Sequence, residues 1–105
     1  MDKVEQFLLR IGIPPSNKGF GELANAVRLY QSGERVFTGN DGIYAKAASS
    51  DKWTRAERNM RTCVQAAYNR VPDLEGRLGC PCDCNRGSLT LKDFIAAVAL
   101  RTKEE

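Results

Sequence analysis

Apolar residues recur along the chain at the three- and four-residue spacing of amphipathic helices. The alternation of β-branched or aromatic residues with polar ones, which would indicate strands, extends over only a few positions at a time. The pattern therefore predicts an all-α fold of about five to six helices. We expect the main helices at about 2–11, 17–31, 41–48, 52–69 and 90–103, with a further helical turn at 73–78.

Residues with special backbone properties separate these helices. Gly12 and Pro14 end the first helix, and Pro72 marks the far end of the fourth. Thr90 and Asp93 have the spacing of a capping box at the start of the last helix. These boundaries predict helices joined by loops in a single domain that spans residues 1–105.

Four of the five main helices have an apolar stripe that we expect to face the core. The stripes contain Val4, Phe7, Leu8 and Ile11 in the first helix; Phe20, Leu23, Ala24, Val27 and Tyr30 in the second; Trp53, Ala56, Met60, Cys63, Val64 and Ala67 in the fourth; and Leu91, Phe94, Ile95 and Val98 in the last.

The composition excludes several classes of protein. Apolar residues make up 42% and charged residues 28%, as in ordinary globular domains. No apolar run approaches the ~20 residues of a membrane-spanning helix, and the start of the chain has no basic leader, so we expect a cytoplasmic protein without membrane association. The chain has no histidine, no recognisable pair of catalytic carboxylates and no phosphate-cradling glycine loop. We therefore expect neither an enzyme nor a cofactor.

The positive charge is concentrated in one segment. The chain as a whole carries a net charge of only +3. Residues 52–70 contain five basic residues and one acid, a net charge of +4. Such a local concentration is typical of an element that faces phosphates.

A helix over residues 52–69 separates its polar residues from its apolar stripe. Its polar face contains Thr54, Arg55, Arg58, Arg61, Thr62, Gln65 and Asn69. Glu57 lies at the margin of this face, four residues before Arg61, where a helical ion pair can form. For its start, the sequence offers two alternatives: a cap at Ser50 or Asp51, or a capping box from Thr54 to Glu57.

The helix at 52–69 follows the short helix at about 41–48 after a tight connection through Ser49–Asp51. This arrangement predicts a helix-turn-helix whose second member is the helix at 52–69. In that motif the second helix enters the major groove, where arginine, glutamine and threonine side chains can bond to base edges. The alternative interpretation is a polar face that is merely solvated. Charge and architecture together make double-stranded DNA as good an interpretation of this face as a merely solvated surface.

Several segments resemble, in the same order, the DNA-binding effector domain of the master sporulation response regulator. The opening Phe7–Pro14 (FLLRIGIP) and the following Lys18–Phe20 and Leu23–Tyr30 are similar to the start of that domain. Thr54–Arg61 (TRAERNMR) is similar to the core of its recognition helix, and Asp93–Ala99 (DFIAAVA) is similar to its last helix.

This resemblance implies a six-helix transcription factor domain whose fourth helix reads a short DNA box, with binding to tandem boxes as a homodimer. It implies that Arg55, Glu57, Arg58 and Arg61 face DNA, with Arg55 and Arg58 as the first choices for base contacts and Thr54 for a phosphate. Thr62 and Gln65 complete the expected DNA-binding set.

The chain also departs from the family pattern. Thr62 stands where the family has a histidine, and residues 31–44 are glycine-rich and align poorly. The phosphorylated receiver domain of the family is missing, which implies either an excised domain or a stand-alone protein without phosphorylation control. The target DNA sequence is therefore expected to differ.

Three cysteines, Cys80, Cys82 and Cys84, have no counterpart in the family pattern. Zinc prefers four ligands, usually with two residues between paired cysteines, and the chain has no histidine to add. We favour an unliganded loop over a metal, redox or disulfide role. Two functional alternatives to the DNA-binding regulator stay open: a protein-interaction module of the same fold that has lost DNA binding, and a small metal-binding or redox protein that uses this loop.

Overall fold

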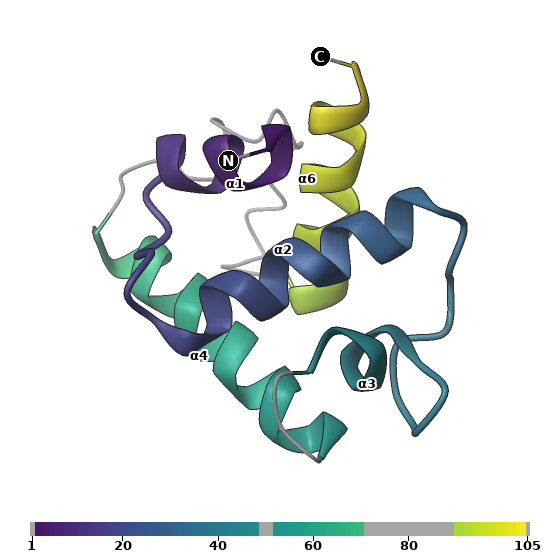
Figure 1. Ribbon diagram of the computed structural model, residues 1–105. Coiled ribbons are helices and arrows are strands. Elements are labelled where there is room, and N and C mark those ends of the chain that lie inside the picture. The colour runs from purple at the N-terminus through teal and green to yellow at the C-terminus, as the bar shows by residue number, and fades with distance from the viewer. Residues whose placement is uncertain (1, 49–51, 71–89, 105) are drawn as a thin grey trace.

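The computed structural model describes residues 2–48, 52–70 and 90–104. These contain only helices and their connections: α1 (Lys3–Arg10), α2 (Lys18–Gln31), α3 (Ile43–Ala47), α4 (Trp53–Arg70) and α6 (Leu91–Glu104) (Figure 1). The predicted all-α fold is confirmed, and all five main helices lie where the pattern placed them. The predicted turn at 73–78 lies outside the described residues.

Both ends of α1 are set by local chemistry. Asp2 Oδ1 accepts a hydrogen bond from the Glu5 amide at 2.9 Å, and Glu5 Oε1 accepts one from the Asp2 amide at 3.5 Å. This capping box satisfies amides that a helix start leaves unpaired. At the other end, Gly12 has a φ of 99°, a left-handed conformation that favours glycine and stops the helix.

The loop before α3 folds back onto the start of that helix. The Ile43 amide donates to the Val36 carbonyl oxygen at 2.8 Å, and the Tyr44 amide donates to that of Phe37 at 3.1 Å. A Cβ at Gly42 would lie 2.4 Å from the Phe37 carbonyl oxygen, so only glycine fits here. As a result α3 begins at Ile43, two residues after the predicted start.

Helix α2 lies at the centre of the fold and packs against α1, α3, α4 and α6 (Figure 1). Its Leu23, Ala26 and Val27 side chains are fully buried. The predicted apolar stripes are buried throughout, with two exceptions: Tyr30 and Trp53 are only half-buried. The core therefore forms from the same faces that the periodicity indicated.

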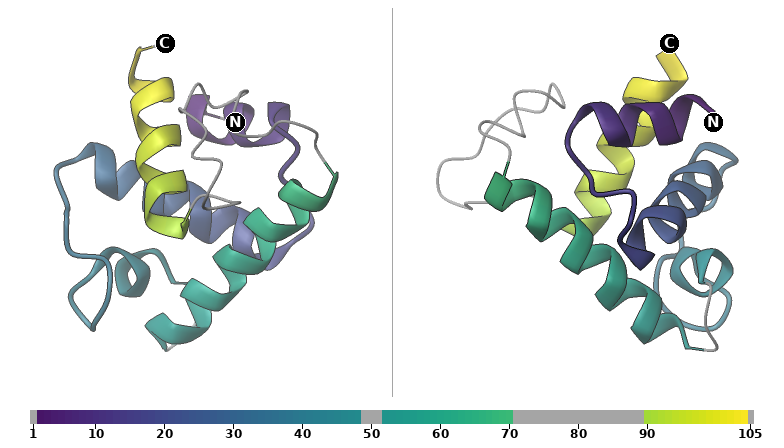
Figure 2. Two further views of the ribbon diagram at one scale, coloured as in Figure 1. Left: turned by 180° about the vertical axis from the view of Figure 1, so that it is seen from behind. Right: turned by 60° about the vertical axis from the view of Figure 1, so that its left-hand side comes forward.

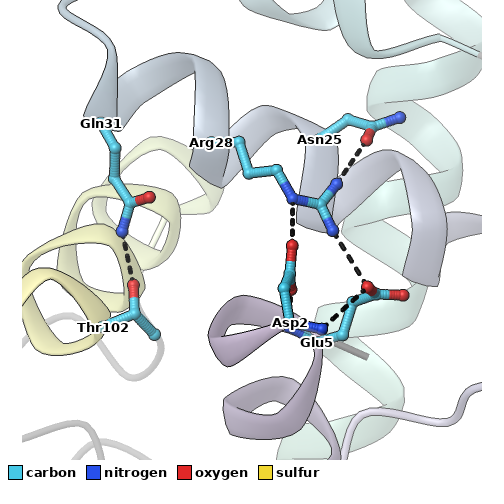
Figure 3. Close-up of polar contacts among 6 residues, drawn as sticks. All are labelled: Asp2, Glu5, Asn25, Arg28, Gln31 and Thr102. Atoms are coloured by element: carbon cyan, nitrogen blue, oxygen red, sulfur yellow. Dashed lines mark hydrogen bonds and ion pairs between the residues drawn. The ribbon is translucent and has the colours of Figure 1, made fainter. Parts of the chain in front are cut away.

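Polar side chains fasten α2 to both terminal helices (Figure 3). Arg28 Nε donates to Asp2 Oδ2 at 2.6 Å, and its Nη2 donates to Glu5 Oε1 at 3.1 Å. The hydrogen bond from Arg28 is the main reason that the pKa of Asp2 is lowered. On the other side, Gln31 Nε2 donates to Thr102 Oγ1 of α6 at 2.6 Å. These contacts fix how the helices around α2 are oriented.

Helices α3 and α4 form the predicted helix pair. The rings of Tyr44 on α3 and Trp53 on α4 stack with their centres 6.5 Å apart. α4 begins at Trp53, because the Lys52 carbonyl oxygen accepts the first helical hydrogen bonds, from the Arg55 and Ala56 amides. The alternative start at a Thr54–Glu57 capping box is thus wrong, since Thr54 already lies within the helix.

Candidate nucleic-acid interface

The apolar side of α4 is anchored in the core. Ala56, Met60, Cys63, Val64 and Ala67 are buried against the rest of the protein. The closest approach is to the start of α2, where a Cβ added at Gly19 would lie 2.3 Å from the Asn59 carbonyl oxygen. Only a residue without a side chain permits this packing distance. The anchoring fixes which side of α4 faces outward.

A buried polar contact reinforces this packing, and the sequence pattern did not predict it. Glu22 of α2 is only 2% exposed, and Asn59 Nδ2 donates to its Oε1 at 3.1 Å. Neither residue lies on a predicted stripe. A charged residue at an inward position of α2 was the one available signal, because such a residue usually needs a polar partner.

The opposite side of α4 points away from the other described helices (Figure 2). All but one of the predicted DNA-facing side chains are exposed there: Thr54, Arg55, Arg58, Arg61, Thr62 and Gln65. The exception is Glu57, which is partly buried at the margin. The structure therefore brings the predicted residues together on one continuous helical face.

Glu57 and Arg61 form the ion pair that their spacing predicted. The Glu57 side chain is 18% exposed and that of Arg61 is 68% exposed, so the carboxylate is the fixed partner and the guanidinium is the outer one. Glu57 thus orients Arg61 and offsets its charge.

Unlike Arg61, Arg55 and Arg58 are not held in an ion pair with another described residue. Among the described residues, no hydrogen bond or ion pair engages either guanidinium group, and both side chains are exposed. Each group can present its fork of donors to an external acceptor. The two residues lie three positions apart and therefore on the same side of the helix.

A groove of about 620 Å³ runs beside this face. Its lining comes from the loop before α3, from α3, from α4 and from the first turn of α6: Thr38, Tyr44, Trp53, Glu57, Arg61, Val64, Gln65, Tyr68, Thr90, Leu91 and Lys92. Burial raises the pKa of Tyr44 to about 12, and the nearby Arg61 offsets this rise only in part. Sequence reasoning did not find Lys92, because nothing in α6 alone shows that its first turn borders α4.

Of the cysteines, Cys63 lies among the residues that the structure describes. Cys63 is fully buried, as its position on the apolar stripe predicted, and burial raises its pKa to about 11. Cys80, Cys82 and Cys84 lie outside the described residues, so the hypotheses for their loop stay predictions. Within 2–48, 52–70 and 90–104, no group of three or more potential ligands is placed to hold a metal ion.

No protein-family model, no curated protein and no solved structure matches the chain. Among the described residues, no helix is long and apolar enough to cross a membrane.

Proposed function

We propose that this chain is a cytoplasmic, sequence-specific DNA-binding transcriptional regulator and that α4 is its recognition helix. The observation that carries the proposal is the outward face of α4, on which Arg55 and Arg58 are exposed and unengaged by other described residues. The resemblance to the sporulation effector domain supports the same function. Binding to tandem sites as a homodimer is part of the proposal.

The dimensions of α4 suit the major groove of DNA. The helix has 18 residues and is therefore about 27 Å long, and its diameter of roughly 10–12 Å matches a groove about 12 Å wide. Arg55 and Thr62 are separated by two helical turns, about 10 Å along the axis. Side chains between them can therefore reach several successive base pairs.

The chemistry of the face matches what the groove offers. An arginine can donate two hydrogen bonds to O6 and N7 of guanine, and glutamine or threonine can bond to base edges or phosphates. Arg55 and Arg58 are available for such bonds without first breaking an ion pair with another described residue. Arg61 is held by Glu57 and is better suited to a phosphate than to a base.

The proposal is tested by selecting bound duplexes from a random library and then measuring the affinity of the selected duplex. Arg58→Ala should weaken binding by about 1–3 kcal/mol and relax the base preference at one position of the site. The matched control is Arg101→Ala, which removes the same charge from an exposed position on α6. It should leave both affinity and base preference nearly unchanged.

Three results would contradict the proposal. A pool of bound duplexes without any enriched sequence would exclude sequence-specific recognition. Equal effects of Arg58→Ala and Arg101→Ala on every duplex would remove α4 from the recognition step. Retention of the fold without any DNA affinity at low salt would favour the protein-interaction module instead.

A further inference from the structure

The groove between α4 and α6 is continuous with the outward face of α4. Arg61 and Gln65 belong to both, because each is exposed on the helix and also lines the groove. Any ligand that covers the face of α4 would therefore pass along this groove. Trp53, Val64, Tyr68 and Leu91 contribute apolar surface to its lining.

The far wall of the groove carries a cation that the proposed function has not used. Lys92, on the first turn of α6, holds its ammonium group 5.6 Å from the centre of the Phe37 ring. This contact positions the ammonium group without neutralising it. Across the groove, the charge of Glu57 is already offset by Arg61. Among the described residues that line the groove, one net positive charge therefore remains, at Lys92.

We propose that this groove receives the sugar–phosphate backbone of one DNA strand while α4 occupies the major groove, and that Lys92 contacts a phosphate of that strand. The inference rests on the proposed function. When a helix fills the major groove, the two strand backbones border it on either side, so surfaces beside the helix meet phosphates. The groove supplies apolar side chains for the sugars and a cation for the phosphate.

The inference predicts a salt effect that α4 alone does not produce. Each phosphate contact releases a condensed counterion, which steepens the dependence of log K on log salt by about 0.9. Loss of one contact should therefore weaken binding by about eightfold at 0.1 M salt, since the affinity difference grows by ~10^0.9 for each decade below 1 M. Phosphates are present in every sequence, so the loss should be the same on selected and unrelated duplexes.

The experiment compares Lys92→Ala with Lys103→Ala, measuring affinity for the selected duplex and for an unrelated duplex at several salt concentrations. Both lysines are exposed on α6, and eleven residues, or about 16 Å, separate them along the helix. The two variants lose the same charge. Lys92→Ala should lower the salt slope by about 0.9, whereas Lys103→Ala should match the wild type. Lys92→Arg, which keeps the charge, should restore the slope.

The outcomes separate the two proposals. If Arg58→Ala weakens binding but Lys92→Ala and Lys103→Ala have equal salt slopes, the groove does not hold the DNA backbone. The proposed role of α4 as the recognition helix is then unaffected. If Lys92→Ala relaxes base preference without changing the slope, the phosphate contact is likewise overturned. If the wild type binds no duplex at any salt concentration, the proposed function itself fails.

Discussion

At the scale of single residues, the arginines show that residue type alone does not determine role. Arg28 is held by Asp2, Glu5 and Asn25 and serves the packing of α1 on α2. Arg61 is paired with Glu57 on the same helix. Arg58 has no such partner among the described residues. Arg28 therefore serves the fold, and the base contacts that we propose fall to Arg55 and Arg58.

Cys63 provides a test of how tightly α4 is packed. Its folded pKa of about 11 lies above its ordinary value of 9, because burial disfavours the thiolate. Well below pH 9 the thiol is protonated in both the folded and the unfolded chain, so it does not make the free energy of unfolding depend on pH. Between about pH 9 and 11 the unfolded chain ionises first, so the free energy of unfolding should fall by up to about 1.4 kcal/mol per pH unit through this group.

Urea unfolding of the wild type and of Cys63→Ala across this pH range measures the effect. The wild type should lose stability more steeply than the variant, and the two should have parallel profiles below pH 9. Identical slopes from pH 9 to 11 would show that Cys63 is accessible to water and that α4 is packed more loosely than described.

At the scale of elements, the contact between α2 and α4 depends on one of two nearby glycines of α2, Gly19, and not on the other, Gly21. A Cβ at Gly19 would meet the Asn59 carbonyl oxygen at 2.3 Å and Cys63 Cβ at 3.0 Å, whereas a Cβ at Gly21 would meet nothing within 4 Å. Gly19→Ala should therefore push the helices apart and lower the free energy of unfolding by about 1–3 kcal/mol.

Gly21→Ala is the matched control on the same helix. It should raise the free energy of unfolding by up to about 1 kcal/mol, because alanine favours the helix and nothing obstructs its methyl group. Chemical denaturation of both variants checks the pair. A stabilising Gly19→Ala would mean that α2 and α4 do not approach each other this closely.

The helices were predictable because their signals are local. Periodicity and capping residues placed both ends of α1, α2, α4 and α6 to within one residue. The start of α3 was misplaced by two residues because it depends on hydrogen bonds that the Ile43 and Tyr44 amides donate to the carbonyl oxygens of Val36 and Phe37, in the loop that folds back onto this helix. The capping signal at Thr54 was misleading, because the Lys52 carbonyl oxygen already accepts helical hydrogen bonds and Thr54 therefore lies within the first turn.

At the scale of the whole molecule, the outward face of α4 was predictable but its surroundings were not. One helical wheel is enough to separate Arg58 from Met60. The groove beside it needs Thr38, Trp53 and Lys92, which are far apart in the sequence and meet only when α3, α4 and α6 pack together. Trp53 shows the consequence: its stripe position predicted burial, yet it lies half-buried in the groove wall.

The central claim is that the exposed face of α4 meets DNA, and an NMR titration of the protein with the selected duplex tests it most directly. The account predicts that the largest shifts occur in the amide signals of α4 and in the side-chain Nε–Hε signals of Arg55 and Arg58. Signals from α1 and from the end of α6 near Lys103 should change little. Shifts confined to α1 and the end of α6, with α4 unaffected, would contradict it.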